Sequence, residues 1–346
     1  MHRGIVLALA AAVLFGASTP FAKLVVASAH PVLLAGLLYL GSGFGLSAFR
    51  LLRDRGWAAS GLVAGEWPWL TAAVLFGGVL GPVALLIGLA RTDAASASLL
   101  LNLEGVLTAL IAWIIFREHC DRRLVIGMLA IVAGGVLLAW PSQQAETGGS
   151  TGGALWIAVA CACWAIDNNL TRRISGGDAV FIATIKGLTA GAINLVIAWM
   201  LGASWPAAGS ALSTLAIGLV GYGISLALFV LALRELGAAR TGAYFSLAPF
   251  VGVAVALALP GGEAPPLLWP AALLMGVGLW LHLSERHDHE HHHEPLEHSH
   301  LHWHDEHHHH EHSGIATEEP HVHRHTHTAV THKHAHFPDL HHRHRH

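Results

Sequence analysis

The sequence predicts an all-α membrane protein of ten transmembrane helices, arranged as two related halves and followed by a polar tail. Three observations support this fold class. The 346-residue chain is 53% hydrophobic and only 12% charged, with a mean hydropathy of +0.52. It contains ten apolar runs long enough to cross about 30 Å of hydrocarbon. Arginines gather in alternate connections, as a consistent membrane topology requires.

The ten apolar runs follow one another through short connections, several of which carry Gly or Pro. Arg3 precedes the first run, which is too long for the apolar region of a signal peptide and is therefore interpreted as a span. The predicted spans cover residues 4–27, 31–49, 68–90, 94–116, 124–140, 154–172, 178–201, 210–233, 238–259 and 266–284.

Arginine placement tests this span list. With a cytoplasmic N-terminus, twelve arginines fall in inside segments and only Arg91 falls in an outside loop. Cytoplasmic loops carry an excess of Lys and Arg, so the bias supports an even number of spans. We therefore expect a multi-pass protein of the plasma (inner) membrane with both termini in the cytoplasm. The inside arginines are Arg3, Arg50, Arg53, Arg55, Arg117, Arg122, Arg123, Arg172, Arg173, Arg234, Arg240 and Arg286.

The two halves, residues 1–142 and 153–285, repeat each other weakly. The segment 15–23 of the first span aligns with 164–172 of the sixth, and 102–106 of the fourth with 246–250 of the ninth. Five spans per half is an odd number, so the second half is inserted upside down relative to the first. Inverted repeats of this kind build alternating-access transporters, whose substrate sites lie near the midplane.

The motifs in these spans resemble those of one transporter family. The matching residues are Phe15-Gly-x-x-x-Pro20-x-x-Lys23, Leu103-Glu104-Gly105-Val106-x-Thr108 running to Arg117-Glu118, Gly127 through Gly134-Gly135-Val136, and Arg234-x-Leu-Gly237 ahead of Pro249. Over residues 4–284 the chain resembles an EamA-type member of the drug/metabolite transporter superfamily with two EamA repeats. The resemblance implies a ten-helix fold that exports or imports small solutes. The family usually carries a proline where this sequence has Gly105.

Glu104 is the clearest ionisable residue inside a span, with Asn102 two residues earlier. A charged side chain at the centre of a membrane helix costs about 2.5–3.5 kcal/mol on insertion scales and commonly marks a transport pathway. The hypothesis is that Glu104 binds a proton or cation coupled to transport. The alternative is a structural carboxylate that pairs with another helix.

Asp167, followed by Asn168, and Lys186 lie in the sixth and seventh spans at similar predicted depth. A mutually neutralised pair is cheaper in a membrane than two separate charges, so an ion pair between them is one interpretation. If they are unpaired, Lys186 favours an anionic substrate and Asp167 a cationic one. Trp164 and Tyr244 are candidates to line the pathway, although aromatic residues also serve at membrane interfaces.

The tail, residues 286–346, is rich in histidine and has no apolar periodicity, so we expect it to be disordered without a ligand. Residues 287–312 repeat at 321–346 with an offset of 34, and eleven histidines superpose. This pattern indicates a tandem duplication. The first copy is acidic and the second basic, so the two copies could lie against each other and share metal.

The His-x-His alternation places successive imidazoles on one side of an extended chain, and imidazole suits Zn, Ni and Co. The tail is therefore predicted to bind divalent metal, whereas no cofactor is expected to be required. A proton buffer and a nonspecific metal sponge are the alternatives. The candidate ligands are His287, His289, His291, His293, His298, His300, His302, His307, His308, His321, His323, His325, His327, His332, His334, His336, His341 and His342.

These observations favour a secondary transporter of a small solute, coupled to an ion or proton and acting as an exporter. One alternative is a Ni, Co or Zn exporter whose tail collects its own substrate, and another is a membrane-anchored metal sensor or store. No nucleophile motif, phosphate-binding loop or zinc-protease signature indicates an enzyme. The expected partners are the lipid bilayer and a small-molecule or metal substrate, without nucleic acid; a homodimer is left open.

Overall fold

The fold is taken from a computed structural model of the whole chain. It describes residues 2–27, 29–56, 60–116, 122–140, 149–174, 177–262, 264–283, 288–293, 296–302, 321–327 and 330–335. The chain divides into a helical unit within residues 1–285 and a strand unit within residues 286–337. Each unit is described by itself below.

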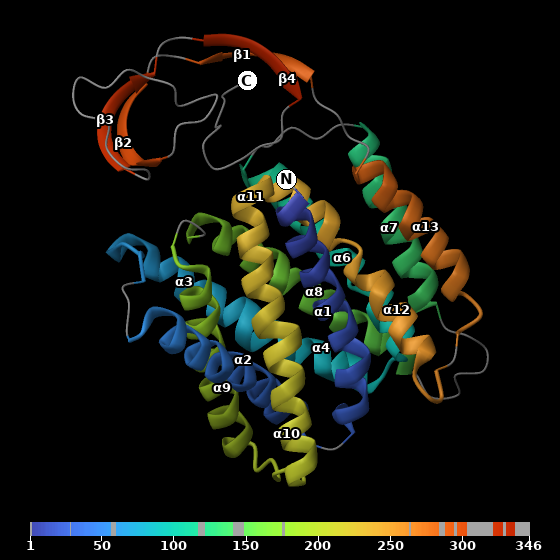
Figure 1. The fold of residues 1–346 in the computed structure, drawn as a ribbon. Helices are drawn as coiled ribbons and strands as arrows, with labels where there is room; N and C mark the ends of the chain where they lie inside the picture. The colour runs from blue at the N-terminus through green and yellow to red at the C-terminus, as the bar shows by residue number, and fades with distance from the viewer. Residues whose placement is uncertain are drawn as a thin grey trace. The chain divides into compact units, whose positions relative to one another are not determined.

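The helical unit follows the predicted order of spans (Figure 1). Its first half contains α1 (His2–Val26), α2 (Pro31–Asp54), a third span made of η1 (Ala64–Glu66), α3 (Trp67–Ala73), η2 (Val74–Leu80) and α4 (Gly81–Ala90), a fourth made of α5 (Ala94–Leu100) and α6 (Asn102–Phe116), and α7 (Arg122–Ala139). Its second half contains α8 (Gly149–Ile174), α9 (Ala179–Met200), α10 (Ala208–Ile217), η3 (Gly218–Ile224), α11 (Ser225–Phe245), α12 (Ala248–Ala258) and α13 (Leu268–Leu283).

Eight helical segments within the described residues are long and apolar enough to cross a membrane. Two shorter apolar helices, Ala248–Ala258 and Leu268–Leu281, account for the ninth and tenth predicted spans. The predicted all-α membrane fold is therefore confirmed. Large apolar side chains such as Leu52 and Trp199 are 81% and 79% exposed, as expected of surfaces that face lipid.

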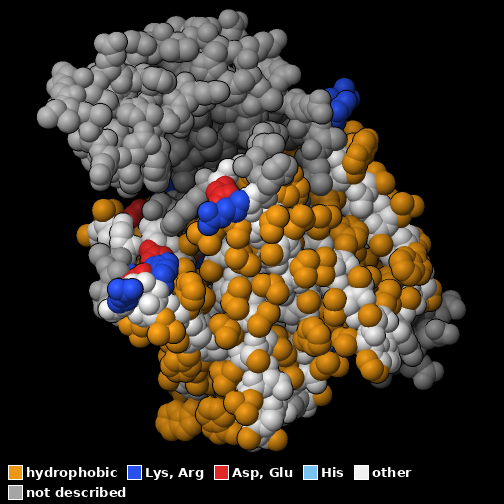
Figure 2. Space-filling view, in the orientation of Figure 1, with side chains coloured by type: hydrophobic (Ala, Val, Ile, Leu, Met, Phe, Trp, Pro, Cys, Tyr) orange, Lys and Arg blue, Asp and Glu red, His pale blue; other side chains and the backbone are white. Residues whose placement is uncertain are grey.

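The face drawn in Figure 2 is covered with apolar side chains along most of its height, and its charged side chains gather toward the end of the helical unit where the chain begins. Arg3, Glu235, Arg53 and Asp54 belong to ion pairs with exposed or partly exposed members. Charges confined to the ends of apolar helices are expected when hydrocarbon surrounds the middle.

The third and eighth spans share a feature that the sequence analysis did not predict. Each contains a seven-residue π-helical segment, η2 (Val74–Leu80) in the third and η3 (Gly218–Ile224) in the eighth. The π-helix is rare, and inside α-helices it frequently occurs at functional sites. Its appearance in equivalent spans of both halves supports the internal repeat.

Two predicted span boundaries differ from the structure. The fourth span, predicted as one helix over 94–116, is interrupted at Leu101, ahead of Gly105. The eighth span does not end near residue 233, because α11 continues to Phe245 and the chain breaks its helix at Ser246 and Leu247 instead. Pro249 explains the second break, since a proline within a helix removes a donor and clashes with the carbonyl four residues earlier.

Helices α2 and α9 pack closely through glycines. A Cβ atom added to Gly187 would lie 2.6 Å from the backbone nitrogen of Gly43, and one added to Gly43 would lie 2.6 Å from that of Leu188. Small residues let membrane helices approach backbone to backbone, where van der Waals packing drives association. This contact joins the second span of one half to its equivalent in the other.

The strand unit contains two antiparallel pairs, β1 (Asp288–His293) with β4 (Val330–Ala335) and β2 (Leu296–His302) with β3 (His321–His327). The sequence analysis expected the tail to be disordered without a ligand, and the described residues of the tail form these two pairs. Because every pairing joins one copy of the duplication to the other, backbone hydrogen bonds replace the apolar core that the composition cannot supply.

Candidate functional site

A buried ion pair joins the sixth and seventh spans. Lys186 of α9 approaches both carboxylate oxygens of Asp167 of α8, with N–O distances of 2.7 and 2.6 Å. The two residues are only 4% and 6% exposed. Thr171, one turn after Asp167 on α8, donates a further hydrogen bond to its Oδ1 at 2.9 Å. Of the two interpretations that the sequence left open, the structure therefore shows the ion pair, which neutralises both charges.

The π-helical segment η2 packs directly on this ion pair. A Cβ atom added to Gly77 would meet the Asp167 carboxylate, so only glycine lets the two helices approach this closely. The Gly77 carbonyl accepts hydrogen bonds from Trp164 Nε1, at 3.0 Å, and from the Tyr39 hydroxyl. Since a π-helical stretch shifts the normal backbone ladder, its carbonyls can take up side-chain donors of this kind.

Glu104 lies in the first turn of α6, just after the break in the fourth span. Its Oε1 accepts a hydrogen bond of 2.7 Å from Nδ2 of Asn168, the residue that follows Asp167. The positive end of a helix dipole favours a negative charge at this position. Asp167 and Lys186 also lie close enough to act on the Glu104 carboxyl electrostatically. The two interactions therefore form one polar region that draws on the fourth, sixth and seventh spans.

Two further sequence candidates lie elsewhere. Asn102 is buried and donates to the Leu99 carbonyl at 3.0 Å, and its Nδ2 lies 3.7 Å from Met275 Sδ of α13. Tyr244 packs against a small apolar cluster of Ala8, Ala232 and Leu236, between α1 and α11. Neither side chain has a described contact with the Asp167–Lys186 pair, whereas Trp164 reaches it through Gly77.

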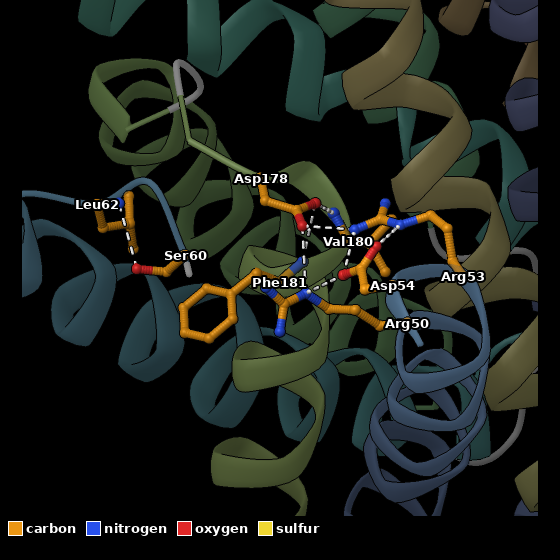
Figure 3. Close-up of polar contacts among 8 residues, drawn as sticks. All are labelled: Arg50, Arg53, Asp54, Ser60, Leu62, Asp178, Val180 and Phe181. Carbon is orange, nitrogen blue, oxygen red and sulfur yellow. Dashed lines mark hydrogen bonds and ion pairs between the residues drawn. The ribbon is translucent and has the colours of Figure 1, made fainter. Parts of the chain in front are cut away.

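A second ionic cluster lies where α2 ends and α9 begins (Figure 3). The Asp178 carboxylate is 3.2 Å from Arg50 Nε and 2.8 Å from Arg53, and Arg53 also pairs with Asp54 at 2.6 Å. Asp178 caps α9 by accepting from the Val180 amide at 2.9 Å. The cluster therefore ties one half of the molecule to the other at an end of the helices.

The titration of Asp178 is set by two opposing effects. Burial alone would raise its pKa, but hydrogen bonds from Arg53 and Arg50, together with the charge of Arg53, outweigh burial and hold the pKa below its usual value. Arg50 itself is only 3% exposed, and its guanidinium lies 5.0 Å from the centre of the Phe181 ring. The carboxylate therefore stays ionised at neutral pH.

A cavity of about 230 Å³ lies at another part of the helical unit. Its polar walls come from Lys23 of α1 and Asp93, which caps α5, and its remaining walls include Pro260 and Gly261 after α12. The Lys23 ammonium donates to the Leu89 carbonyl. Both halves of the chain therefore contribute to this opening.

The comparisons with known proteins agree with this architecture. A model of the EamA-like transporter family matches residues 2–140 and again 151–284. The chain belongs to the EamA-like transporter family. This membership confirms the two predicted repeats and a multi-pass membrane transporter of small solutes, and the family is one of transporters rather than enzymes.

Individual relatives cover different shares of the chain. An uncharacterized transporter of Methanothermobacter thermautotrophicus is 28% identical over 264 residues, 72% of this chain and 77% of that protein. An uncharacterized transporter of Bacillus subtilis is 27% identical over 194 residues, 53% of this chain and 62% of that one. A probable 4-amino-4-deoxy-L-arabinose-phosphoundecaprenol flippase subunit of Pseudomonas paraeruginosa is 39% identical over 112 residues, 31% of this chain and 93% of that one.

One solved structure shares the fold at a TM-score of 0.61 and 21% identity. The alignment covers 80% of this chain and 94% of the other protein. At this level of identity the likeness supports the arrangement of helices alone, which agrees with the family match.

Several residues of the polar region were not candidates in the sequence analysis. Tyr39 and Thr171 are uncharged polar residues, so the sequence did not distinguish them from other polar residues in the spans. Gly77 has no side chain that could indicate a functional role. The Gly77-Gly78 pair inside an apolar run was the available signal, since adjacent glycines in a membrane helix mark close packing. Asn194 uses the second glycine, donating to the Gly78 carbonyl at 3.1 Å.

The candidate metal ligands of the tail divide into two groups. His289, His291, His293, His298, His300, His302, His321, His323, His325, His327, His332 and His334 lie in the four strands, while His287, His307, His308, His336, His341 and His342 lie outside the described residues. Among the side chains that the structure describes, which do not include those of the four strands, no group of three or more His, Cys, Asp or Glu could hold a metal ion.

Proposed function

We propose that this EamA-family protein is a proton- or cation-coupled secondary transporter that exports a small solute, with Glu104 as the coupling site. The observation that carries the proposal is the Glu104–Asn168 hydrogen bond of 2.7 Å at the interrupted fourth span. Transporters of inverted-repeat design place substrate and ion sites at discontinuous helices near the midplane. A carboxylate at such a break is well placed to bind and release a cation.

The neighbouring Asp167–Lys186 pair explains why Glu104, rather than Asp167, is assigned this role. Lys186 contacts both oxygens of Asp167, so that carboxylate is already neutralised. The described partner of the Glu104 carboxylate is an uncharged amide, which satisfies one oxygen and leaves the charge in place. A proton or a cationic group of the solute can supply the missing positive charge.

Coupling follows if proton and solute compete for Glu104. A protonated carboxyl has no net charge and releases a cationic solute, while the ionised form binds it again. In an inverted-repeat transporter, rocking of one half against the other exposes the same site to each side in turn. Exchange of a proton for the solute would then drive export wherever the outside is more acidic.

The relatives favour a polar organic solute. The similar Pseudomonas protein is named as a probable subunit of a flippase for a lipid-linked amino sugar. An amine is the kind of group that a membrane carboxylate can pair with, so an amine-bearing solute suits Glu104. For orientation, we propose cytoplasmic termini in the plasma membrane, as the arginine bias supports.

A divalent-metal-binding tail is the second part of the proposal, and it keeps a Ni, Co or Zn exporter as the alternative. In that alternative the tail collects the ion and Glu104 receives it. The spans offer few ligands for a metal ion, since the Asp167 carboxylate already forms an ion pair with Lys186. A membrane-anchored metal sensor or store is the alternative of another class, although it leaves the polar region of the spans unexplained. Neither alternative requires a homodimer.

Proteoliposomes containing a pH-sensitive dye test the proposal directly. We expect one or more probes from a set of primary amines, Zn²⁺, Ni²⁺ and Co²⁺ to cause proton flux through the wild-type protein. Glu104→Gln should abolish that flux, whereas Glu235→Gln, which removes an exposed carboxylate paired with Arg3, should leave it intact. Undiminished, pH-dependent transport by Glu104→Gln would contradict the assigned role.

The metal alternative is separated by a cellular measurement. Intracellular Zn, Ni and Co are measured in cells that express the full chain, a chain truncated after His282, or Glu104→Gln. A metal exporter lowers the content of its ion in the first case and less so in the other two. If all three leave metal content unchanged, the exporter alternative fails and an organic solute stands.

A further inference from the structure

The two strand pairs of the tail keep a single register. Asp288 is opposite Ala335 at one end of the first pair, and His302 is opposite His321 at the far end of the second. In both pairs the residue numbers rise along one strand as they fall along the opposite strand, and the second pair continues the register of the first without an offset. The two described strand pairs therefore follow the register of a single antiparallel hairpin.

This register interlocks the two copies of the tandem duplication. With the 34-residue offset, β1 is equivalent to β3 and β2 to β4, yet the pairs formed are β1 with β4 and β2 with β3. The first strand of each copy therefore pairs with the second strand of the other copy. Such an arrangement is symmetric on exchange of the copies, and it needs a duplicated sequence.

The histidines of one copy meet the histidines of the other in this register. Five positions place histidine directly opposite histidine: His289 with His334, His291 with His332, His298 with His325, His300 with His323 and His302 with His321. The same register sets Glu290 of the acidic copy opposite Lys333 of the basic copy. Opposite charges across a ladder stabilise it, so the charge difference between copies favours pairing between them.

The spacing of these positions suits a metal site. Residues two apart share a face of a strand, and directly opposite residues have Cβ atoms about 4.5–5.5 Å apart. Five histidines, at 289, 291, 293, 332 and 334, share one face of the first pair, and seven share one face of the second. Zn²⁺ prefers four ligands in a tetrahedron, and imidazole nitrogen is one of its usual donors.

We infer that a divalent cation of the Zn²⁺ type bridges the two copies of the tail, each bound ion drawing imidazoles from both arms of the hairpin. Isolated two-stranded hairpins are marginal in water, so the ion would supply the stability that the sequence lacks. A nonspecific metal sponge has no need of register. The inference rests on the proposed metal-binding role of the tail and adds its architecture.

Spin labels test the register without touching a histidine. Cys120, Cys161 and Cys163 are first replaced by serine in the full-length protein in detergent. Leu301→Cys with Val322→Cys labels two opposite positions. Leu301→Cys with Val330→Cys is the control, because Val330 is opposite His293, eight residues or about 26 Å along the arm from Leu301. Zn²⁺, which is diamagnetic, should broaden the spectrum of the first pair only, and a chelator should reverse it.

Zn²⁺ stoichiometry tests whether the copies share their ions. One variant changes His298, His300 and His302 to glutamine, a second changes His321, His323 and His325, and a third combines them. Shared sites predict that either trio lowers the bound Zn²⁺ as much as both trios together, since each loss destroys the same site.

The outcomes separate this inference from the proposed metal-binding role. Losses that add up across the two trios, or equal broadening in both labelled pairs, would overturn the shared sites while leaving a metal-binding tail. Full-length protein that binds no more Zn²⁺ than the chain truncated after His282 would remove the metal-binding role and the shared sites together. Broadening of the first pair with non-additive losses supports both.

Discussion

The helical unit contains two ionic clusters that differ in where they lie and in what they join. The Asp167–Lys186 pair lies inside the spans, both members are buried, and a π-helical carbonyl and an adjacent carboxylate surround it. The Arg50–Arg53–Asp54–Asp178 cluster lies at helix ends, and Arg53 is 39% exposed. Charges at helix ends need only reach water, whereas charges inside the spans must be neutralised.

The contrast separates a cluster with an evident structural purpose from one that the proposed transport pathway would use. The cluster at the helix ends has an evident structural purpose, because it caps α9 and fastens it to α2. The buried pair fastens α8 to its sequence neighbour α9, which a short connection already holds close. A stabilising role therefore gives little reason for its cost, while a transport pathway does. The predictions below test this contrast.

The largest effect is expected from breaking the buried pair. Lys186→Met leaves an uncompensated carboxylate among apolar side chains, and removing one partner of a buried pair typically costs about 3–5 kcal/mol. The double variant Asp167→Asn with Lys186→Met should recover most of that loss, because the amide oxygen of the new asparagine can still accept from Thr171. Thermal unfolding in detergent measures both.

Transport by the double variant then sharpens the contrast. If the pair belongs to the pathway, the double variant folds but has lost proton-coupled flux in proteoliposomes. A double variant that is stable and transports at the wild-type rate would make the pair purely structural.

The next effect concerns the glycine on which the pair rests. Gly77→Ala places a methyl group against the Asp167 carboxylate, and overpacking of this kind costs about 1–3 kcal/mol. Gly105→Ala is the matched control, since an added Cβ there meets nothing within 4 Å and alanine is the better helix former. Equal melting temperatures for the two variants would show that the close approach of η2 to α8 does not contribute to the stability of the protein.

The sequence predicted the ten helices and the two repeats, and it offered the Asp167–Lys186 pair as one of two interpretations, because each depends on local patterns. Apolar runs, arginine bias and the short connection before Lys186 all lie close together along the chain. The π-helical segments and the donation by Tyr39 to Gly77 were missed, since they depend on which spans pack together. The continuation of α11 to Phe245 was missed as well, because Arg234 and Glu235 marked a connection without breaking the helix.

The cluster at the helix ends predicts a smaller, graded effect. Arg50 is buried and contacts both Asp178 and the Phe181 ring, so Arg50→Gln should cost about 1–3 kcal/mol as a lost charge-assisted hydrogen bond. Arg53 is partly exposed, and Arg53→Gln should cost about 0.2–1 kcal/mol. Both variants should keep coupled transport once folded. If Arg50→Gln is stably folded but has lost proton-coupled flux, the cluster at the helix ends is required for transport and is not purely structural.

The smallest effect is the pH dependence of Asp178. Its pKa is lowered in the folded protein, so its stabilisation is fully present above the usual aspartate value of about 3.9 and is lost only as the pH falls through the lowered value. The variant Asp178→Asn keeps a side chain that can cap α9, which isolates the contribution of the charge. The difference in melting temperature between wild type and Asp178→Asn should therefore stay constant from about pH 5 to 8 and shrink only in stronger acid. A difference that already falls between pH 7 and 6 would mean that Arg50 and Arg53 do not hold the carboxylate ionised, and the cluster would then be as open to titration as a transport site.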